Sequence, residues 1–260
     1  GVLTDHVHTP RAIAKRMMEY HLDKDYTMRV AEHLGNPKKE KIYNIYSIEE
    51  ISEMSFSSPN CVLLMKAPNS TQQRPALGIP DTKFVLLNDR AKMITKAPIR
   101  VIDLSLLELH NSRTFWDIGA CTGSVSIEAR RQYPHLNIQA FEVREECKDI
   151  IRANARLHSA PGIDLHIGNF LNLPIAEDAI VDAVFIGGHG GKLKEIICKV
   201  ASHLDKLKGK IVFNSVSEES NKLFREAVEE NDLKLHSEMN ITVDSNNPIT
   251  ILCATGKYHV

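Results

Sequence analysis

The 260-residue sequence has no long hydrophobic run and no excess of charge of one sign. No apolar stretch approaches the ~18 residues of a membrane-spanning helix, and no signal peptide precedes the first predicted element. The formal net charge of −1 provides no overall attraction for nucleic acid or for an anionic membrane. These absences favour a cytoplasmic enzyme or binding protein without nucleic-acid or membrane partners.

Cysteine is scarce, and no two cysteines have C-x-x-C spacing. There are five, an odd number, and they are scattered, which argues against a disulfide framework and for a reducing compartment. No spacing of His, Cys and Asp suggests a zinc site, so we predict no metal. The cysteines are Cys61, Cys121, Cys147, Cys198 and Cys253.

The N-terminal part of the chain has the pattern of a small α/β segment. Thr9 and Pro10 predict the start of a helix that runs to about Tyr20. Ser47 and Glu50 have the spacing of a capping box before a second, short helix. Strands are predicted at 28–34, 40–46 and 60–66, the last of them as a buried strand.

A stretch at 67–81 contains three prolines and no periodicity, which is typical of a linker. We therefore expect two domains, 1–76 and 77–260. The chain begins Gly-Val-Leu-Thr-Asp, without Met, as if it entered in the middle of a fold. We expect the first segment to be part of a larger domain.

Strands and helices alternate regularly after the linker, which predicts a parallel sheet covered by helices on both faces. The chain ends in two strand-like runs without a helix between them, which predicts an antiparallel hairpin. The expected fold is a doubly wound α/β sheet of the kind found in methyl-donor enzymes. Strands are expected at 114–118, 137–142, 163–168, 180–187, 210–215, 233–243 and 248–255. Helices are expected at 99–109, from Ser124 onward, and at 144–157, 191–203 and 217–230.

Glycines follow the first of these strands, directly behind an acid. Gly119 allows a sharp turn, and Gly123 allows backbone to approach a ligand closely, beside Asp117. Glu142 ends the next strand, where a carboxylate can accept hydrogen bonds from both ribose hydroxyls of an adenosine. Asn169 and Phe170 follow the third strand and could flank the adenine. The alternative is that the glycines only make a tight turn.

Two phosphate-binding motifs are missing, which narrows the choice of adenosine ligand. Gly119, Cys121 and Ser124 stand in the register of the dinucleotide motif G-x-G-x-x-G, so two of its three glycines are absent. The P-loop ending G-K-[ST] is missing as well. S-adenosylmethionine needs no pyrophosphate cradle, only polar backbone and a carboxylate such as Asp117. We predict S-adenosylmethionine as the cofactor, rather than NAD.

Four glycines crowd into residues 187–191, after the fourth strand, where a methyl acceptor is expected. Their backbone N–H groups and the following helix start could bind an anion, or they could form an ordinary turn. His189 in this turn could move a proton near neutral pH or be a solvated loop residue. The usual Asn/Asp-Pro-Pro-aromatic turn of amino-methylating enzymes is missing here.

Several motifs resemble the decarboxylating precorrin-6Y methyltransferases of cobalamin biosynthesis, specifically their carbon-15 methylating and decarboxylating module. They are ITK-x3-R (94–100), WDIGACTGSVSIE (116–128), FIGGHGG (185–191) and NSV (214–216). This resemblance runs from about Leu77 to the end. Residues 1–76 resemble the C-terminal half of the carbon-5 module, a tetrapyrrole methylase fused upstream, through LTD, TPRAIA and VAEHLGNPKKEKI.

The resemblance implies a precorrin substrate and a homo-oligomer, a tetramer. The family usually has Gly where this chain has Cys121, Ser where it has His189, and often Glu where it has Pro98. The cofactor-binding residues expected from the pattern and the resemblance together are Thr95, Asp117, Gly119, Ala120, Cys121, Thr122, Gly123, Glu142, Asn169 and Phe170. The substrate-binding residues expected are Lys96, Arg100, Gly187, Gly188, Gly190, Gly191 and Asn214, with His189 as the catalytic candidate.

A precorrin carries many carboxylates, so scattered cations are expected around its site. Lys96, Arg100, Lys192 and Lys194 lie in the two segments expected to face it, although each could equally be an ordinary surface residue. Three other functions stay open. A class I methyltransferase for RNA or protein would share the fold, a nicotinamide-dependent oxidoreductase would need the missing glycines, and a non-catalytic scaffold would not need Asp117 and Glu142.

Overall fold

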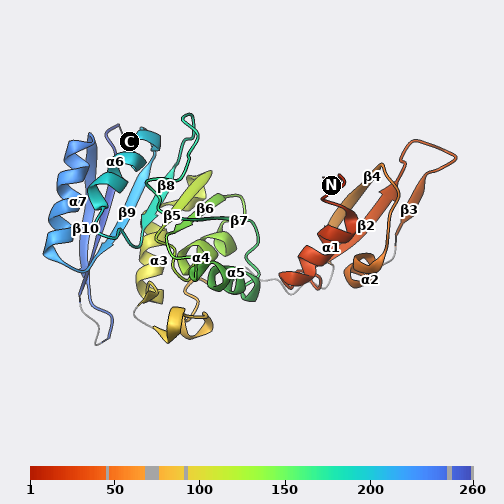
Figure 1. Cartoon of the computed structure of the whole chain (residues 1–260), viewed down its shortest axis with the longest axis horizontal. Coiled ribbons are helices and arrows are strands. Elements are labelled where there is room, and N and C mark those ends of the chain that lie inside the picture. Colours follow the sequence, from red (N-terminus) through yellow and green to blue (C-terminus); the bar gives the residue numbers. More distant parts are fainter. Residues whose placement is uncertain (45–46, 68–75, 91–92, 245–247, 259–260) are drawn as a thin grey trace. The chain divides into compact units, whose positions relative to one another are not determined.

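The computed structural model describes residues 1–44, 47–67, 76–90, 93–244 and 248–258. The chain forms two compact units, one mainly of residues 1–75 and one mainly of residues 76–155 and 160–260 (Figure 1). Most of the predicted linker lies outside the described residues. What kind of domain the smaller unit belongs to stays a prediction.

The smaller unit is a four-stranded antiparallel sheet in the order β1-β4-β2-β3, with two short helices. Thr9 caps the first helix by accepting a hydrogen bond from Ala12 N–H, and the capping box predicted at Ser47 and Glu50 is present. The elements are β1 (Val2–Leu3), α1 (Pro10–Glu19), β2 (Tyr26–Glu32), β3 (Lys41–Tyr43), α2 (Ile48–Glu53) and β4 (Asn60–Lys66).

The prediction of a buried strand at 60–66 is wrong in one respect. Strand β4 has those bounds, but Val62 is its one buried residue and Leu63 on the other face is 45% exposed. An antiparallel sheet commonly buries one face and leaves the other in solvent, and here α1 and α2 contribute to the core on one face. The continuous apolar run does not distinguish the two faces.

The larger unit is a seven-stranded sheet in the order β10-β11-β9-β8-β5-β6-β7. Neighbouring strands from β9 to β7 pair in parallel, and β11 pairs antiparallel with both β9 and β10. The predicted fold class is confirmed. The elements are η1 (Asp81–Lys83), η2 (Leu87–Asp89), α3 (Ala97–Leu106), η4 (Leu109–Asn111), β5 (Thr114–Ile118), α4 (Ser124–Gln132), β6 (Asn137–Glu142), α5 (Cys147–Leu157), β7 (Ile163–Ile167), β8 (Ala183–Ile186), α6 (Leu193–His203), β9 (Lys210–Ser215), α7 (Glu218–Glu230), β10 (Leu233–Ile241) and β11 (Ile249–Gly256).

Helices cover both faces of this sheet, as Figure 1 shows. In β5, Trp116 and Ile118 point into the core formed with α6 and α7, and Phe115 points into the core formed with α3 and α4. The central strand is therefore apolar on both faces, which explains its continuous hydrophobic run. Its neighbours β6 and β8 lie on opposite sides of it, so the strand order reverses at β5. In such sheets, ligands bind at the carboxyl end of the strand where this reversal occurs.

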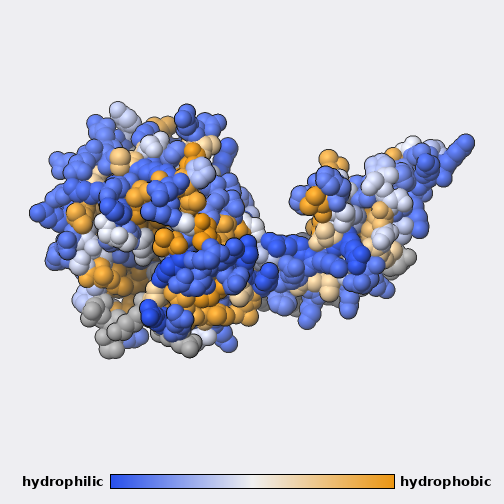
Figure 2. Space-filling view, viewed as in Figure 1, coloured by the Kyte–Doolittle hydropathy of each residue, from blue (hydrophilic) through white to orange (hydrophobic). Residues whose placement is uncertain are grey.

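None of the helices among the described residues is both long and apolar enough to cross a bilayer. Hydrophilic residues cover much of the face seen in Figure 2, with hydrophobic residues interspersed on the larger unit.

A buried ion pair joins α3 to α4. Arg100 Nε donates to Glu128 Oε2 at 2.8 Å, and their side chains are 0% and 1% exposed. Glu128 also accepts hydrogen bonds from the backbone N–H groups of Gly78 and Ile79. Arg100 donates further to the carbonyls of Ile79 and Thr95. The pair thus fixes the segment before α3 against α4.

Replacing Glu128 tests how much this pair contributes to stability. We expect Glu128→Gln to lower the free energy of unfolding by about 3 kcal/mol, because the buried Arg100 loses its counter-ion at 2.8 Å and keeps the longer contact with Asp81 at 3.4 Å. Glu145→Gln is the matched control, since Glu145 pairs with Lys148 at the surface and should change stability by less than about 0.5 kcal/mol. Urea unfolding measures both variants, and equal losses would contradict the assigned role.

Candidate active site

A cavity of about 950 Å³ lies at the carboxyl ends of the parallel strands. Its walls bring together segments that are far apart in the sequence, following β5, β6, β7, β8 and β9 and preceding α3. Of the residues predicted to bind ligands, those lining the cavity are Thr95, Lys96, Asp117, Gly119, Ala120, Cys121, Thr122, Glu142, Asn169, Phe170, Gly187, Gly188, His189, Gly190 and Asn214. The roles assigned to them stay predictions.

Arg100 does not line this cavity, and its predicted contact with substrate is wrong. Its side chain is fully buried, and its donors are used by Glu128, Asp81 and backbone carbonyls. An arginine in the first turns of an amphipathic helix can face either way, and here a buried carboxylate draws it inward. Lys194 is also turned away, because it pairs with Glu226 and Glu230 on α7.

Two predicted glycines also lie outside the cavity wall. Gly123 caps α4 at φ +74°, and a Cβ there would lie 3.0 Å from the Ile151 side chain. The requirement for glycine thus comes from packing against α5, not from close approach of a ligand as predicted. Gly191 has φ +79°, and its N–H donates to His189 Nδ1 at 3.2 Å.

The turn after β5 touches the turn after β8. Gly119 has φ +79°, and a Cβ there would lie 2.6 Å from the backbone nitrogen of Gly188. No side chain fits in this contact, so two glycine-rich turns meet backbone to backbone. A Cβ at Gly188, by contrast, would meet nothing within 4 Å. Gly188 therefore presents its backbone to open space in the cavity.

Alanine at the two positions should have very different effects. We expect Gly119→Ala to lower the free energy of unfolding by about 2 kcal/mol or more, from the left-handed backbone and the collision with Gly188. Gly188→Ala is the matched control and should change stability by less than about 0.5 kcal/mol. Thermal or urea unfolding measures both. Similar losses would show that the turns do not meet as described.

Asp117 is a buried carboxylate of which only one oxygen has a partner among the described residues. Its Oδ2 accepts from Ser126 N–H at 3.1 Å and from Ser126 Oγ at 2.6 Å, in the first turns of α4. Its Oδ1 is buried without a hydrogen-bond partner among the described residues, and Asp117 lines the cavity. Burial raises the pKa of Asp117 to about 6. Buried polar atoms are normally hydrogen-bonded, so an acceptor without a partner beside a cavity is expected where a ligand donates to it.

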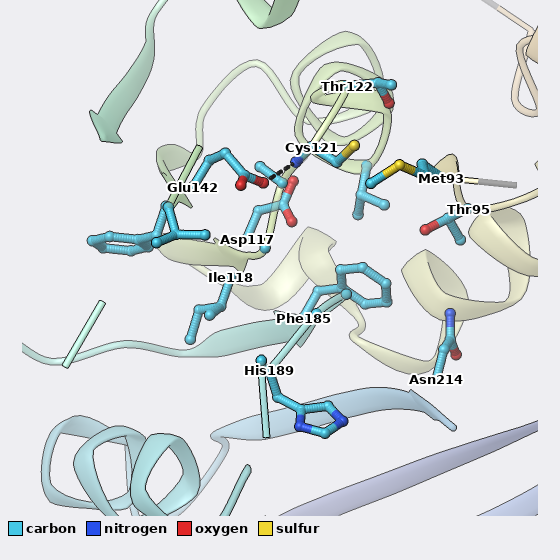
Figure 3. Close-up of a pocket in the computed structure, with 18 of the residues that line it drawn as sticks. Met93, Thr95, Asp117, Ile118, Cys121, Thr122, Glu142, Phe185, His189 and Asn214 are labelled. Atoms are coloured by element: carbon cyan, nitrogen blue, oxygen red, sulfur yellow. Dashed lines mark hydrogen bonds between the residues drawn. The ribbon is translucent and has the colours of Figure 1, made fainter. Parts of the chain in front are cut away.

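Glu142 lies beside Asp117 and is held very differently (Figure 3). Its carboxylate accepts from Cys121 N–H at 2.8 Å and from Arg144 Nε at 2.8 Å. Burial raises the pKa of Glu142, but these hydrogen bonds outweigh that effect and hold the pKa below its usual value. Glu142 is therefore ionised at neutral pH.

The other side of the cavity contains the glycine turn and two lysines. His189 lies edge-on to Phe213 at a centroid distance of 5.8 Å, and burial lowers its pKa. Because Nδ1 accepts from Gly191 N–H, the neutral ring carries its proton on Nε2. Lys96 and Lys192 line the cavity and pair with Asp81 and Glu195.

Asp103, which holds the predicted cavity residue Asn214 without lining the cavity itself, and several residues that do line it were not predicted from the sequence. Asn214 donates to Asp103 Oδ2 at 2.7 Å, and burial raises the pKa of Asp103 to about 8, so this acid is protonated near neutral pH. Asp103 stands in an amphipathic helix, where its sequence position gives no sign of a partner 111 residues away. Met93, Arg144 and Phe185 also line the cavity, and only the place of Arg144 two residues after Glu142 could have indicated it.

The strand order and the cavity at the end of β5 are those of class I S-adenosylmethionine-dependent methyltransferases. A solved precorrin-6Y C5,15-methyltransferase from Geobacter metallireducens is 32% identical, with a TM-score of 0.63. The likeness covers 71% of this chain and 100% of that one.

Residues 87–251 match the model of the precorrin methyltransferase domain, and the chain belongs to this family. It is similar to a cobalt-precorrin-6B C(15)-methyltransferase (decarboxylating) of Salmonella typhimurium, with 35% identity over 127 residues. That match covers 49% of this chain and 64% of the relative, just under two thirds of its length. A precorrin-6Y C(5,15)-methyltransferase of Mycobacterium tuberculosis is 25% identical over 222 residues, covering 84% of this chain and 53% of that protein.

Proposed function

We propose that the chain methylates a precorrin-6 or cobalt-precorrin-6 macrocycle at carbon 15 and decarboxylates a ring acetate, with S-adenosylmethionine as methyl donor. One observation carries the proposal. A single cavity joins the acids and the glycine loop of a donor site to a second glycine turn with two lysines. The relatives named for this reaction in cobalamin biosynthesis support the choice of substrate.

The residues present fit the donor. Asp117 Oδ1 is a buried acceptor with no partner among the described residues, which suits the amino-acid end of the donor. Glu142 is an ionised carboxylate at the end of β6, where ribose hydroxyls are bound in sheets of this kind. Phe170 and Asn169 follow β7 and are assigned to the adenine. The bound donor would supply an activated methyl group, so the protein mainly needs to position the acceptor carbon.

The methyl-accepting substrate is assigned to the side of the cavity formed by residues 187–190. Their open backbone, together with Lys96 and Lys192, offers donors and positive charge for the acetate and propionate groups of a tetrapyrrole. When carbon dioxide leaves a ring acetate, the electron pair of the broken carbon–carbon bond passes into the macrocycle. A proton then completes the new methyl group, and His189 Nε2–H is the donor we assign to it.

Residues 1–76 are proposed to be the C-terminal half of a carbon-5 tetrapyrrole methylase module. The match to the mycobacterial relative is longer than residues 77–260, so it includes part of this segment. The tetramer implied by the resemblance, the cytoplasmic location and the absence of nucleic-acid and membrane partners stay predictions.

Calorimetric titration tests the donor site directly. We expect S-adenosylmethionine and S-adenosylhomocysteine to bind and NAD not to bind, because the pyrophosphate motif is missing. Glu142→Ala should weaken donor binding by about 1–3 kcal/mol, since it removes hydrogen bonds to a charged acceptor. Saturable binding of NAD without a response to the methyl donor would rule the assignment out.

Mass spectrometry of a precorrin incubated with the chain and donor tests the reaction. We expect one methyl group gained and one carbon dioxide lost, because residues 1–76 are proposed to be only half of the carbon-5 module. Gly188→Val should keep donor affinity and lose turnover, since its side chain enters the acceptor space. His189→Ala should slow carbon dioxide release more than methylation. A gain of two methyl groups, or full turnover by Gly188→Val, would contradict this division of the site.

A further inference from the structure

Every acceptor position of the Glu142 carboxylate is occupied. Oε1 accepts from the backbone N–H of Arg144 at 3.0 Å and from its Nε at 2.8 Å. Oε2 accepts from Cys121 N–H at 2.8 Å and from Arg144 Nη2 at 3.1 Å. An ionised carboxylate offers about four lone-pair sites, two on each oxygen, and Glu142 is only 2% exposed. No ribose hydroxyl can donate to it in this arrangement.

The four hydrogen bonds divide into two pairs with different sources. The backbone N–H groups of Cys121 and Arg144 supply one bond to each oxygen and do not depend on any side chain. The guanidinium of Arg144 supplies the other bond to each oxygen, as a bidentate pair. The two neighbouring hydroxyls of a ribose would also donate one bond to each oxygen. The guanidinium therefore occupies the two positions that the diol requires.

The Arg144 side chain can reach water when it leaves Glu142. It lines the cavity and is 31% exposed, so its charge can move into water while the aliphatic stem stays in place. Its further hydrogen-bond contacts are with Met93 Sδ at 4.0 Å and with the Cys121 side chain, and sulfur is a weak acceptor in both. The backbone bonds keep the carboxylate oriented after the guanidinium has moved.

We propose that Arg144 sets the affinity of the donor site, because its guanidinium stands in for the ribose diol on Glu142 and is displaced when the diol binds. This inference rests on the donor site proposed above. When the methyl donor binds, the two hydroxyls of the diol replace the two hydrogen bonds that the Arg144 guanidinium makes to Glu142. Without Arg144, Glu142 would keep a buried charge with fewer partners in the empty protein, and the diol would relieve it. Both effects make removal of the guanidinium favour binding.

Titration with S-adenosylhomocysteine tests this, because that ligand has no net charge and responds little to a general loss of positive charge. We expect Arg144→Met to bind it about tenfold more tightly than the unaltered chain. Lys148→Met is the matched control, since Lys148 is an exposed cation at the start of α5 that pairs with Glu145. Its affinity should stay within about twofold. Arg144→Gln, which keeps a polar stem, should also bind more tightly.

The gain should depend on the carboxylate and on the diol. In a Glu142→Gln background, Arg144→Met should bring no gain in affinity. With Glu142 present, Arg144→Met should bring a smaller gain in affinity for a 2′-deoxy analogue of the ligand than for the ligand itself. Unchanged or weaker binding by both Arg144 variants, with the unaltered chain binding normally, would overturn the role of Arg144 and leave the donor site intact. Loss of binding in every chain, the unaltered one included, would overturn the proposed function and this inference with it.

Discussion

The buried pair of Arg100 and Glu128 is the interaction on which the wall of the cavity depends. Among the described residues, the segment before α3 contains the short 3₁₀ turns η1 and η2. Glu128 accepts from Ile79 N–H, and Arg100 donates to the carbonyl of Thr95, so the pair ties both ends of this segment to the helices. Thr95 can then stand in the cavity wall although no regular element holds it.

A buried ion pair is retained here because each partner has several further bonds. Removing two charges from water is costly, and their mutual attraction repays it only when the remaining donors and acceptors are also satisfied. Arg100 and Glu128 meet that condition through backbone groups that would otherwise be left without partners. Asp81 connects this pair to the cavity, because it accepts from Arg100 Nη1 and also pairs with Lys96, which lines the cavity.

The parallel sheet, its terminal antiparallel hairpin and most of the cavity could be predicted from the sequence. Parallel strands bring their carboxyl ends to one edge, so residues directly after a strand, such as Gly119 and Glu142, must meet there. Helix starts were also predictable, because capping depends on neighbours within three residues, as at Ser47 and Glu50.

The rest could not be predicted, because it depends on partners distant in the chain. The burial of Arg100 follows from Glu128, 28 residues away, and the role of Gly123 follows from the side chain of Ile151. Strand β4 shows the same limit, since an apolar run does not say which face of a sheet will be covered. The ion pair of Arg144 with Glu142 is local, but in the sequence it has the pattern of an ordinary loop before a helix.

The two acids of the cavity show how one site can shift the pKa values of two carboxyls in opposite directions. Asp117 is buried, its Oδ1 has no hydrogen-bond partner among the described residues, and its pKa is raised to about 6. A hydrogen-bond donor at Oδ1 would therefore stabilise the charged form of Asp117. Glu142 is already stabilised as the anion by the donors around it, and a further ligand can only exchange with one of them. The negative charge of Glu142 also raises the pKa of Asp117. A ligand that donates hydrogen bonds to both acids must therefore form new ones with Asp117 and replace existing ones at Glu142. The affinity of the site follows from the free energy gained at Asp117 and the free energy of the exchange at Glu142.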